Sequence, residues 1–173
     1  KSLGLKDIKV CLNTLGDDES RANYRSALKE YFAPYLDELC GDCKRRYEQN
    51  PLRILDCKVD HDHECMKNAP KMSDYLNEAS QEYFNTVCEL LDKFEIPYEV
   101  DDKLVRGLDY YTHTVFEIVS MNSEMGAQST VLAGGRYDGL ISYFGGPEGM
   151  SGIGWALGME RLLIALEAEG IEL

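Results

Sequence analysis

The sequence lacks any apolar run long enough to cross a membrane. A spanning helix needs roughly 20 consecutive apolar residues, and no stretch of this chain approaches that length. No segment shows the charged, apolar and small-residue order of a signal peptide. Internal repeats and low-complexity tracts are absent as well, so neither a repeat array nor a biased tract is expected. From these absences we expect a cytoplasmic protein with no membrane partner.

Basic charge is also scarce. The chain has 18 Lys and Arg against 31 Asp and Glu, which gives a net charge of −13 and a pI near 4.6. This balance argues against a general nucleic-acid binder. Residues 41–71, however, hold seven basic and six acidic residues, a balance of +1, while the rest of the chain carries −14. A less acidic segment can approach phosphate, and ordinary variation in surface charge explains it equally well.

The apolar content is sufficient for one folded domain. Of the 173 residues, 44% are hydrophobic and 10% are aromatic, which is typical of a globular domain that has room for a small appended subdomain. The chain begins at Lys1 rather than at a methionine and opens almost directly on a strand-like run over residues 8–13. We therefore expect it to be an excerpt of a longer protein.

Apolar periodicity divides the chain into a helical block and pieces of sheet. Gly16 and the two aspartates after it are a turn and helix-start signal, and Pro34 and Pro97 interrupt helical patterns. The predicted elements are a strand over 7–13, helices to about 33, over 34–48 and over 74–94, a loop with short turns over 50–72, strands over 98–106, 109–121 and 128–134, and a closing helix over 158–169. A helical block inserted between strands is an α+β arrangement.

Three segments in the second half combine arginine, tyrosine and glycine. They are LVRGLDYY over 104–111, GGRYDGL over 134–140 and GIGWALGMER over 152–161. Glycines on both sides of residues 136–138 let the backbone approach a ligand closely. In the third segment, glycines lead into an apolar helix with Arg161 in its first turn, from which a guanidinium can reach phosphate. Together the segments predict a site for an amino acid and a nucleotide.

The first segment leads into an extended run, in which residues two apart share a face. Asp109, Tyr111 and His113 are then expected on one face, and Tyr110 and Thr112 on the other, where Tyr110 serves packing. For His113, a place in the site beside Tyr111 and a place on the strand surface are equally compatible with the pattern.

Four neighbours of these motifs have simpler explanations. Arg136 and Asp138 lie two residues apart and could orient the pocket or pair with each other, and we favour a structural role. Glu160 is a helix-start charge favoured by the helix dipole. Trp155 lies in an apolar strand and is expected in the core.

In this order and spacing, the three segments strongly resemble the histidine-specific motifs and the third class-defining motif of class II histidyl-tRNA synthetases. The resemblance extends to residues 50–56, to Ala69-Pro70 and to residues 74–76. It implies a partial class II antiparallel sheet with an inserted helical subdomain. Residues 1–16 and 96–173 would then belong to the later half of the catalytic domain, and residues 17–95 to an insertion that sits over the tRNA acceptor stem.

The resemblance also implies roles for single residues. Arg106 would be catalytic, bind both histidine and ATP, and stabilise charge that develops on the α-phosphate; the alternative for this arginine is an ion pair with Asp101 or Asp102. Tyr111, Tyr137 and Gly135 would bind histidine, since a phenol can donate to or accept from an imidazole nitrogen. Each tyrosine could instead be a core residue. The implied ATP-binding residues besides Arg106 are Gly154, Gly158 and Arg161.

By the same resemblance, the parent protein would activate histidine with ATP and Mg²⁺ and transfer it to the 3′ end of tRNA-His as a homodimer. The chain lacks the family's first motif, which builds the dimer interface, its second motif, the ligands of the α-amino group and the anticodon-binding domain, so the isolated fragment is expected to be inactive. Two alternatives are a non-catalytic paralogue that regulates ATP phosphoribosyltransferase and a sensor domain that binds uncharged tRNA. The intact first segment argues against the former, and Arg106 together with Arg161 argues against the latter.

The cysteines predict a second kind of site. Cys40 and Cys43 have the tight-turn spacing of a zinc knuckle, and Cys57 and Cys65 follow at a longer spacing, with two histidines between them. We consider these four as zinc ligands, with free thiols as the alternative because disulfides are rare in the cytosol. The remaining cysteines lie on apolar faces and are expected to be buried thiols; they are Cys11 and Cys88.

Overall fold

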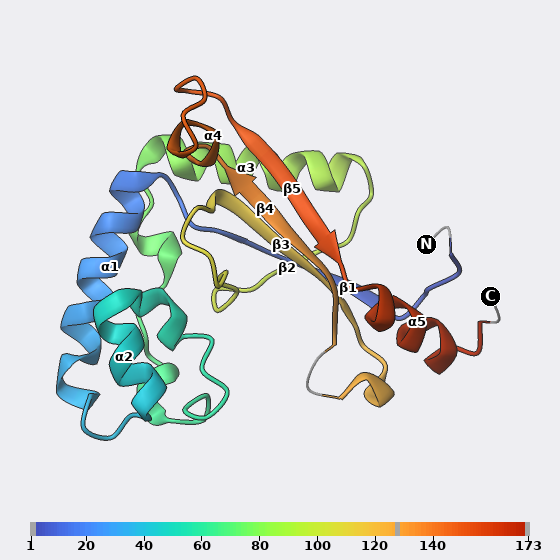
Figure 1. Cartoon of the computed structure of the whole chain (residues 1–173), viewed down its shortest axis with the longest axis horizontal. Coiled ribbons are helices and arrows are strands. Elements are labelled where there is room, and N and C mark those ends of the chain that lie inside the picture. Colours follow the sequence, from blue (N-terminus) through green and yellow to red (C-terminus); the bar gives the residue numbers. More distant parts are fainter. Residues whose placement is uncertain (1–2, 127–128, 172–173) are drawn as a thin grey trace.

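The computed structural model describes residues 3–126 and 129–171. Its five strands form one sheet in the order β2-β1-β3-β4-β5, with β1 and β2 parallel and the other neighbours antiparallel (Figure 1). The strands are β1 (Ile8–Thr14), β2 (Glu99–Val100), β3 (Thr112–Ser120), β4 (Thr130–Tyr137) and β5 (Gly152–Leu157). The start of the chain and its second half therefore meet in one sheet.

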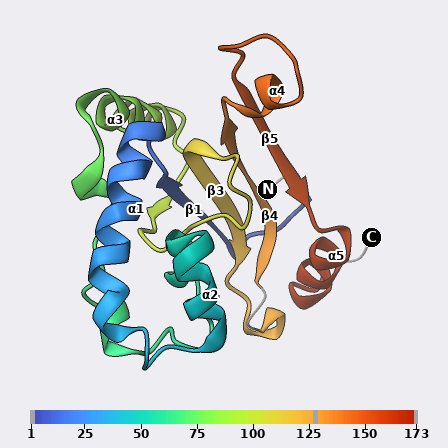
Figure 2. The ribbon, with the colours of Figure 1, turned by 60° about the vertical axis from the view of Figure 1, so that its left-hand side comes forward.

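Helices lie at both ends of this sheet. They are α1 (Asp18–Phe32), α2 (Gly41–Gln49), α3 (Glu78–Lys93), α4 (Leu140–Tyr143) and α5 (Met159–Ala168). Helices α1 and α2 lie side by side at one end, and α5 lies at the other end (Figures 1 and 2). The α+β prediction is confirmed. In the described residues, no helix is both long enough and apolar enough to cross a membrane.

Helix α1 begins and ends where its sequence signals predict. Gly16 has φ of 62°, a left-handed conformation that glycine adopts without strain. The Asp17 side chain then accepts a hydrogen bond from the Ser20 N–H at 2.8 Å, which satisfies one of the free donors of the first turn. The helix ends at Phe32, and Pro34 continues the chain as a short 3₁₀ turn.

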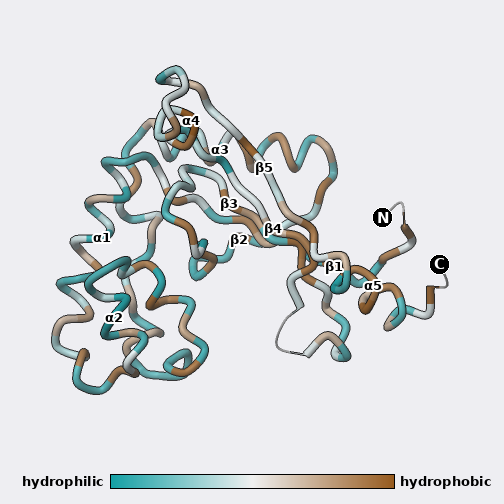
Figure 3. Tube along the Cα trace, in the orientation of Figure 1, coloured by the Kyte–Doolittle hydropathy of each residue, from teal (hydrophilic) through white to brown (hydrophobic). Residues whose placement is uncertain are grey.

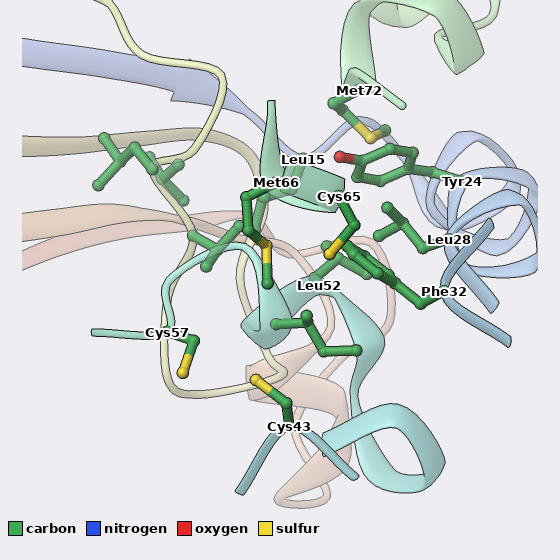
Figure 4. Packing of buried hydrophobic residues seen from close by; sticks show 14 of the residues in the cluster. Leu15, Tyr24, Leu28, Phe32, Cys43, Leu52, Cys57, Cys65, Met66 and Met72 are labelled. Atoms are coloured by element: carbon green, nitrogen blue, oxygen red, sulfur yellow. The ribbon is translucent and has the colours of Figure 1, made fainter. Parts of the chain in front are cut away.

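The main core forms where one face of α1 meets the irregular segment after α2. Tyr24, Leu28 and Phe32 recur every four residues, are at most 1% exposed, and pack on side chains that include Leu52 and Met72 (Figure 4). Burying each such side chain contributes about 1.5–3 kcal/mol. The same cluster continues into the sheet through residues of β1 and β3. Figure 3 shows the corresponding alternation of polar and apolar residues along α1, beside the more apolar central strands.

The helix predicted over 34–48 starts later than expected. Helix α2 begins at Gly41, because Cys40 is extended (φ −63°, ψ 161°) and caps the helix with its thiol, which accepts from the Cys43 N–H. The segment over 50–72 is irregular with short 3₁₀ turns, as predicted. Its apolar side chains are nevertheless buried, including Leu52, Ile54 and Met66.

The strand predicted over 98–106 is wrong for most of its length, since β2 covers only Glu99 and Val100. The chain then turns at Asp101, whose carboxylate accepts from the Lys103 N–H at 2.9 Å and whose carbonyl accepts from the Leu104 N–H at 3.0 Å. Leu104 and the residue after it are buried as loop residues. Their apolar pattern reflects this burial rather than a pleated strand.

The strand predicted over 109–121 also begins later, at Thr112. His113 has φ of 48°, and the pairing of β3 with β4 shifts register between Thr112 and Val115. The expected alternation from Asp109 to His113 therefore does not hold. Strand β4 extends beyond the predicted 128–134 to Tyr137; residue 128 lies outside the described residues.

Two predictions about burial are wrong. Trp155 is 67% exposed, because β5 is the last strand in the order of the described sheet. The apolar spacing of the helix over 74–94 also predicts that Phe94 shares a buried face with Phe84, but Phe94 is 73% exposed at the C-cap of α3.

Candidate active site

Three tyrosines meet at the start of β3 and the end of β4. The rings of Tyr111 and Tyr137 lie 6.3 Å apart between centroids at 74°. Tyr110, predicted on the opposite face, joins them instead, with centroids 4.6 Å from Tyr111 and 5.7 Å from Tyr137. That prediction is wrong because residues 109–111 precede the strand and do not alternate. A hydrogen bond with Tyr111 raises the pKa of the Tyr110 hydroxyl.

Glycines on β4 and β5 leave the space that these rings occupy. Gly135 and Gly154 are partners in the register of the two strands. A Cβ at Gly135 would lie 2.8 Å from the Tyr111 ring, and one at Gly152 would lie 2.3 Å from the Tyr137 ring. A Cβ at Gly154 would lie 2.8 Å from the Tyr137 hydroxyl. The second and third glycine-containing segments therefore shape one aromatic cluster.

Arg106 lies beside this cluster. Its guanidinium is 5.8 Å from the centroid of the Tyr111 ring, and its Nη1 donates to Glu117. Glu117 also accepts from the Thr130 hydroxyl at 2.8 Å. The ion pair thus forms with a β3 residue that the sequence analysis missed, whereas Asp102 pairs with a lysine. The Arg106 side chain remains 21% exposed.

The helical block holds the loop that carries Arg106. Arg21 of α1 donates to the carbonyls of Asp109 at 3.3 Å and of Tyr111 at 2.5 Å. Asn50 donates to the Asp109 carboxylate, and Arg25 lies 3.8 Å from the same group. No sequence motif singles out either arginine of α1. Asn50 is the first residue of the segment over 50–56 that resembles the family, and this resemblance is the sequence signal that indicates a role for it.

The neighbouring polar groups form a second network. Arg136 pairs with Asp138 at 2.9 Å, as predicted, and donates to the Tyr83 hydroxyl at 2.9 Å. The ring of His113 lies 4.8 Å from that of Tyr83. His113 is half-buried, so it lies neither fully inside the site nor fully on the strand surface. Burial lowers the pKa of His113, which favours a neutral imidazole.

An open hollow of about 860 Å³ adjoins the aromatic cluster. Tyr110 and His113 line it on one side, Arg21 and Asp17 of the α1 start on another, and Tyr143 closes a third. A smaller cleft beside Arg106 and Tyr111 is lined by both arginines of α1. Aromatic walls with a few charged groups are typical of sites for small polar ligands.

Arg161 lies in the first turn of α5, as predicted, with Gly158 as the capping residue. A Cβ at Gly158 would lie 3.0 Å from Cγ of Arg161, so the glycine permits the arginine to pack there. Helix α5 begins at the opposite end of β5 from Gly152 (Figure 1). The structure therefore places the third segment along the whole of β5, with the tyrosine cluster at one end and Arg161 at the other.

The predicted zinc ligands are brought together only in part. Cys40, Cys43 and Cys57 converge with Asp60, which the sequence analysis did not include. Cys65 is directed elsewhere, with its sulfur 3.0 Å from Nδ1 of His63. Of the remaining thiols, Cys11 is buried as predicted, whereas Cys88 is only partly buried.

Known proteins with similar sequences cover the whole chain. It is 55% identical over 173 residues to the histidine–tRNA ligase of Oceanobacillus iheyensis and 56% identical to that of Geobacillus thermodenitrificans, and it spans 40% of the length of each. The crystal structure of apo histidyl-tRNA synthetase from S. aureus matches 99% of the chain with 44% identity and a TM-score of 0.74. The chain covers 41% of that protein.

A structure of lower identity agrees on the fold alone. A histidine–tRNA ligase subunit from Alicyclobacillus acidocaldarius matches 96% of the chain with a TM-score of 0.57 at 20% identity.

A family model described as histidyl-tRNA synthetase matches residues 5–162. The chain therefore belongs to the histidyl-tRNA synthetase family.

Proposed function

We propose that this chain is part of a histidine–tRNA ligase, which activates histidine with ATP to histidyl-adenylate and transfers it to the 3′ end of tRNA-His. The observation that carries the proposal is the edge-to-face pair of Tyr111 and Tyr137 with the Arg106 guanidinium beside it. Groups suited to bind the histidine side chain and a group suited to bind a phosphate of ATP then lie next to each other, as adenylate formation requires. ATP enters as its Mg²⁺ complex.

In this proposal, Arg106 stabilises the transition state of adenylate formation. The histidine carboxylate attacks the α-phosphate of ATP, the bond to the β-phosphate breaks with release of pyrophosphate, and negative charge grows on the phosphate oxygens in the transition state. A fixed guanidinium at that point is electrostatic stabilisation, which is commonly the largest catalytic term. Glu117 and the Tyr111 ring hold the guanidinium in place, so little reorganisation is needed when charge develops. Gly154, Gly158 and Arg161 would bind the remainder of ATP.

Tyr111 and Tyr137 would recognise the imidazole of histidine. Each phenol can donate to or accept from a ring nitrogen, whichever the tautomer requires. An apolar amino acid in this pocket would leave buried hydroxyls without partners, and this cost gives selectivity. Gly135 supports the role indirectly, because any side chain there would displace the Tyr111 ring.

The wider assignments rest on the family and are part of the proposal. Residues 17–95 would form the insertion over the acceptor stem, and residues 1–16 and 96–173 the catalytic portion. The parent protein would act as a cytoplasmic homodimer. A regulatory subunit of ATP phosphoribosyltransferase is the weaker alternative, because relatives at 55% identity are named histidine–tRNA ligases.

The test is Arg106→Ala in the full-length protein, measured by ATP–pyrophosphate exchange. We expect exchange to fall by about two orders of magnitude or more, the scale of losing one transition-state donor, with a much smaller change in histidine affinity. Arg45→Ala is the matched control, because Arg45 is exposed and pairs only across its own helix with Asp42 in the described contacts. Near-normal exchange by Arg106→Ala would remove Arg106 from catalysis.

A further inference from the structure

Three thiols and one carboxylate from two separate segments converge at the base of α2. Within residues 3–126 and 129–171, the ligand atoms of Cys40, Cys43, Cys57 and Asp60 all lie within 4.8 Å of one another. Cys43 and Cys57 are buried. We propose that these four residues form a structural zinc site that holds the N-terminus of α2 to the loop after residue 54.

The separations from the Cys57 sulfur to Cys40 and to Asp60 fit one tetrahedral ion. Zinc–sulfur bonds of about 2.3 Å in a tetrahedron place two sulfurs about 3.8 Å apart, and a sulfur and a carboxylate oxygen about 3.5 Å apart. The sulfurs of Cys40 and Cys57 are 3.7 Å apart, and the Cys57 sulfur is 3.7 Å from Oδ2 of Asp60. The same separation of sulfurs is far beyond the length of a disulfide bond.

The two segments repeat one local geometry. The Cys43 N–H donates to the Cys40 sulfur at 3.5 Å, and the Asp60 N–H donates to the Cys57 sulfur at 3.4 Å. In both, the first ligand of a pair accepts from the backbone of the second, three residues on. Such outer hydrogen bonds orient metal ligands and stabilise their anionic form. The sequence thus contains C-x-x-C over 40–43 followed by C-x-x-D over 57–60. Because Asp60 supplies the fourth ligand, Cys65 is not required for zinc binding.

The donor set selects the metal. Three soft thiolates with one carboxylate in a closed tetrahedral arrangement favour zinc over magnesium or calcium, which prefer oxygen ligands. The site would fasten residues 44–56, and this segment includes Asn50, which holds the loop of Arg106 through Asp109.

The test measures zinc in full-length protein purified under reducing conditions without chelators. We expect about one zinc per chain that depends on these residues, since structural sites bind tightly. Cys43→Ser and Cys57→Ser should each lose this zinc. Cys65→Ala and Cys88→Ser should keep it, and they control for the loss of any cysteine. Zinc content that is unchanged in Cys57→Ser overturns the proposal.

Cobalt substitution keeps the test decisive where a serine variant fails to fold. Metal-free wild-type protein titrated with Co²⁺ should develop the visible bands of a tetrahedral site together with sulfur-to-metal charge-transfer absorption. Asp60→Cys should bind Co²⁺ with stronger charge-transfer absorption, because a fourth thiolate replaces the carboxylate. Folded, reduced wild-type protein that takes up neither Co²⁺ nor Zn²⁺, or Asp60→Cys absorption equal to that of wild type, would contradict the site.

Discussion

Tyr137 occupies a space that only glycine leaves open on the neighbouring strand. Side chains at Gly152 or Gly154 would lie within 2.8 Å of its ring or hydroxyl. Gly154, which the resemblance assigns to ATP, therefore also sets the position of a residue assigned to histidine. Two motifs that are separate in the sequence become one site through the register of β4 and β5.

The roles of the two tyrosines can be tested one hydroxyl at a time. In the full-length protein, Tyr111→Phe and Tyr137→Phe should each weaken histidine binding by about 1–3 kcal/mol, because a buried ligand nitrogen loses its partner. Isothermal titration with histidine measures this. Tyr35→Phe is a suitable control, since Tyr35 packs beside Tyr31 in the helical block. Unchanged histidine affinity in both variants would show that the two hydroxyls do not bind histidine and that these tyrosines serve packing.

The residue types of the site were predictable, but their partners were not. Arg106, Tyr111 and Tyr137 stand within recognisable motifs, whereas the pairing of Arg106 with Glu117 depends on how a loop folds back over β3. Asp60 repeats the spacing of the first cysteine pair, and this signal was overlooked because it is not a cysteine. Side-chain partners distant in the sequence are determined by the tertiary fold.

At the scale of elements, local signals fixed the boundaries of α1, where Asp17 caps its start and Pro34 follows its end. The loop over 101–111 could not be predicted in the same way. Its apolar residues mimic a strand, but they are buried because Asn13 of β1 donates to the Leu104 carbonyl at 3.0 Å and the helical block holds its far end. Tertiary contacts outweigh the local pattern here.

Helix α1 should therefore support catalysis by positioning the loop that carries Arg106. Arg21→Ala removes charged hydrogen bonds to two carbonyls of the loop, which should lower the free energy of unfolding by about 1.5–3 kcal/mol. Pyrophosphate exchange should slow as well, since Tyr111 loses its anchor. Arg25→Ala, one turn along, is the control: its more exposed ion pair at 3.8 Å should be worth about 0–1 kcal/mol.

Denaturant unfolding and exchange kinetics of the full-length variants measure both effects. The positioning role predicts that Arg21→Ala reduces kcat at saturating histidine more than Arg25→Ala does. Equal effects of the two substitutions on stability and on kcat would show that Arg21 does not position the loop.

At the scale of the whole molecule, the sheet ends in an apolar strand. Ile153, Trp155 and Leu157 of β5 are 61%, 67% and 41% exposed, and an uncovered apolar edge promotes association. We expect the 173-residue chain, produced alone, to self-associate. Trp155 is its single tryptophan, so its fluorescence emission should shift to shorter wavelength as protein concentration rises.

Sedimentation velocity over the same concentrations gives the independent measurement. Trp155→Lys should reduce association, because a charge on an edge strand opposes pairing. A chain that remains monomeric at all concentrations, with emission typical of an exposed indole, would contradict this expectation.

The most direct test of the central claim is ATP–pyrophosphate exchange by the full-length protein with each standard amino acid in turn. The proposal predicts exchange that depends on histidine and is lost in the Arg106→Ala variant. Exchange with a different amino acid, or the absence of histidine-dependent exchange in folded protein supplied with ATP and Mg²⁺, would contradict it.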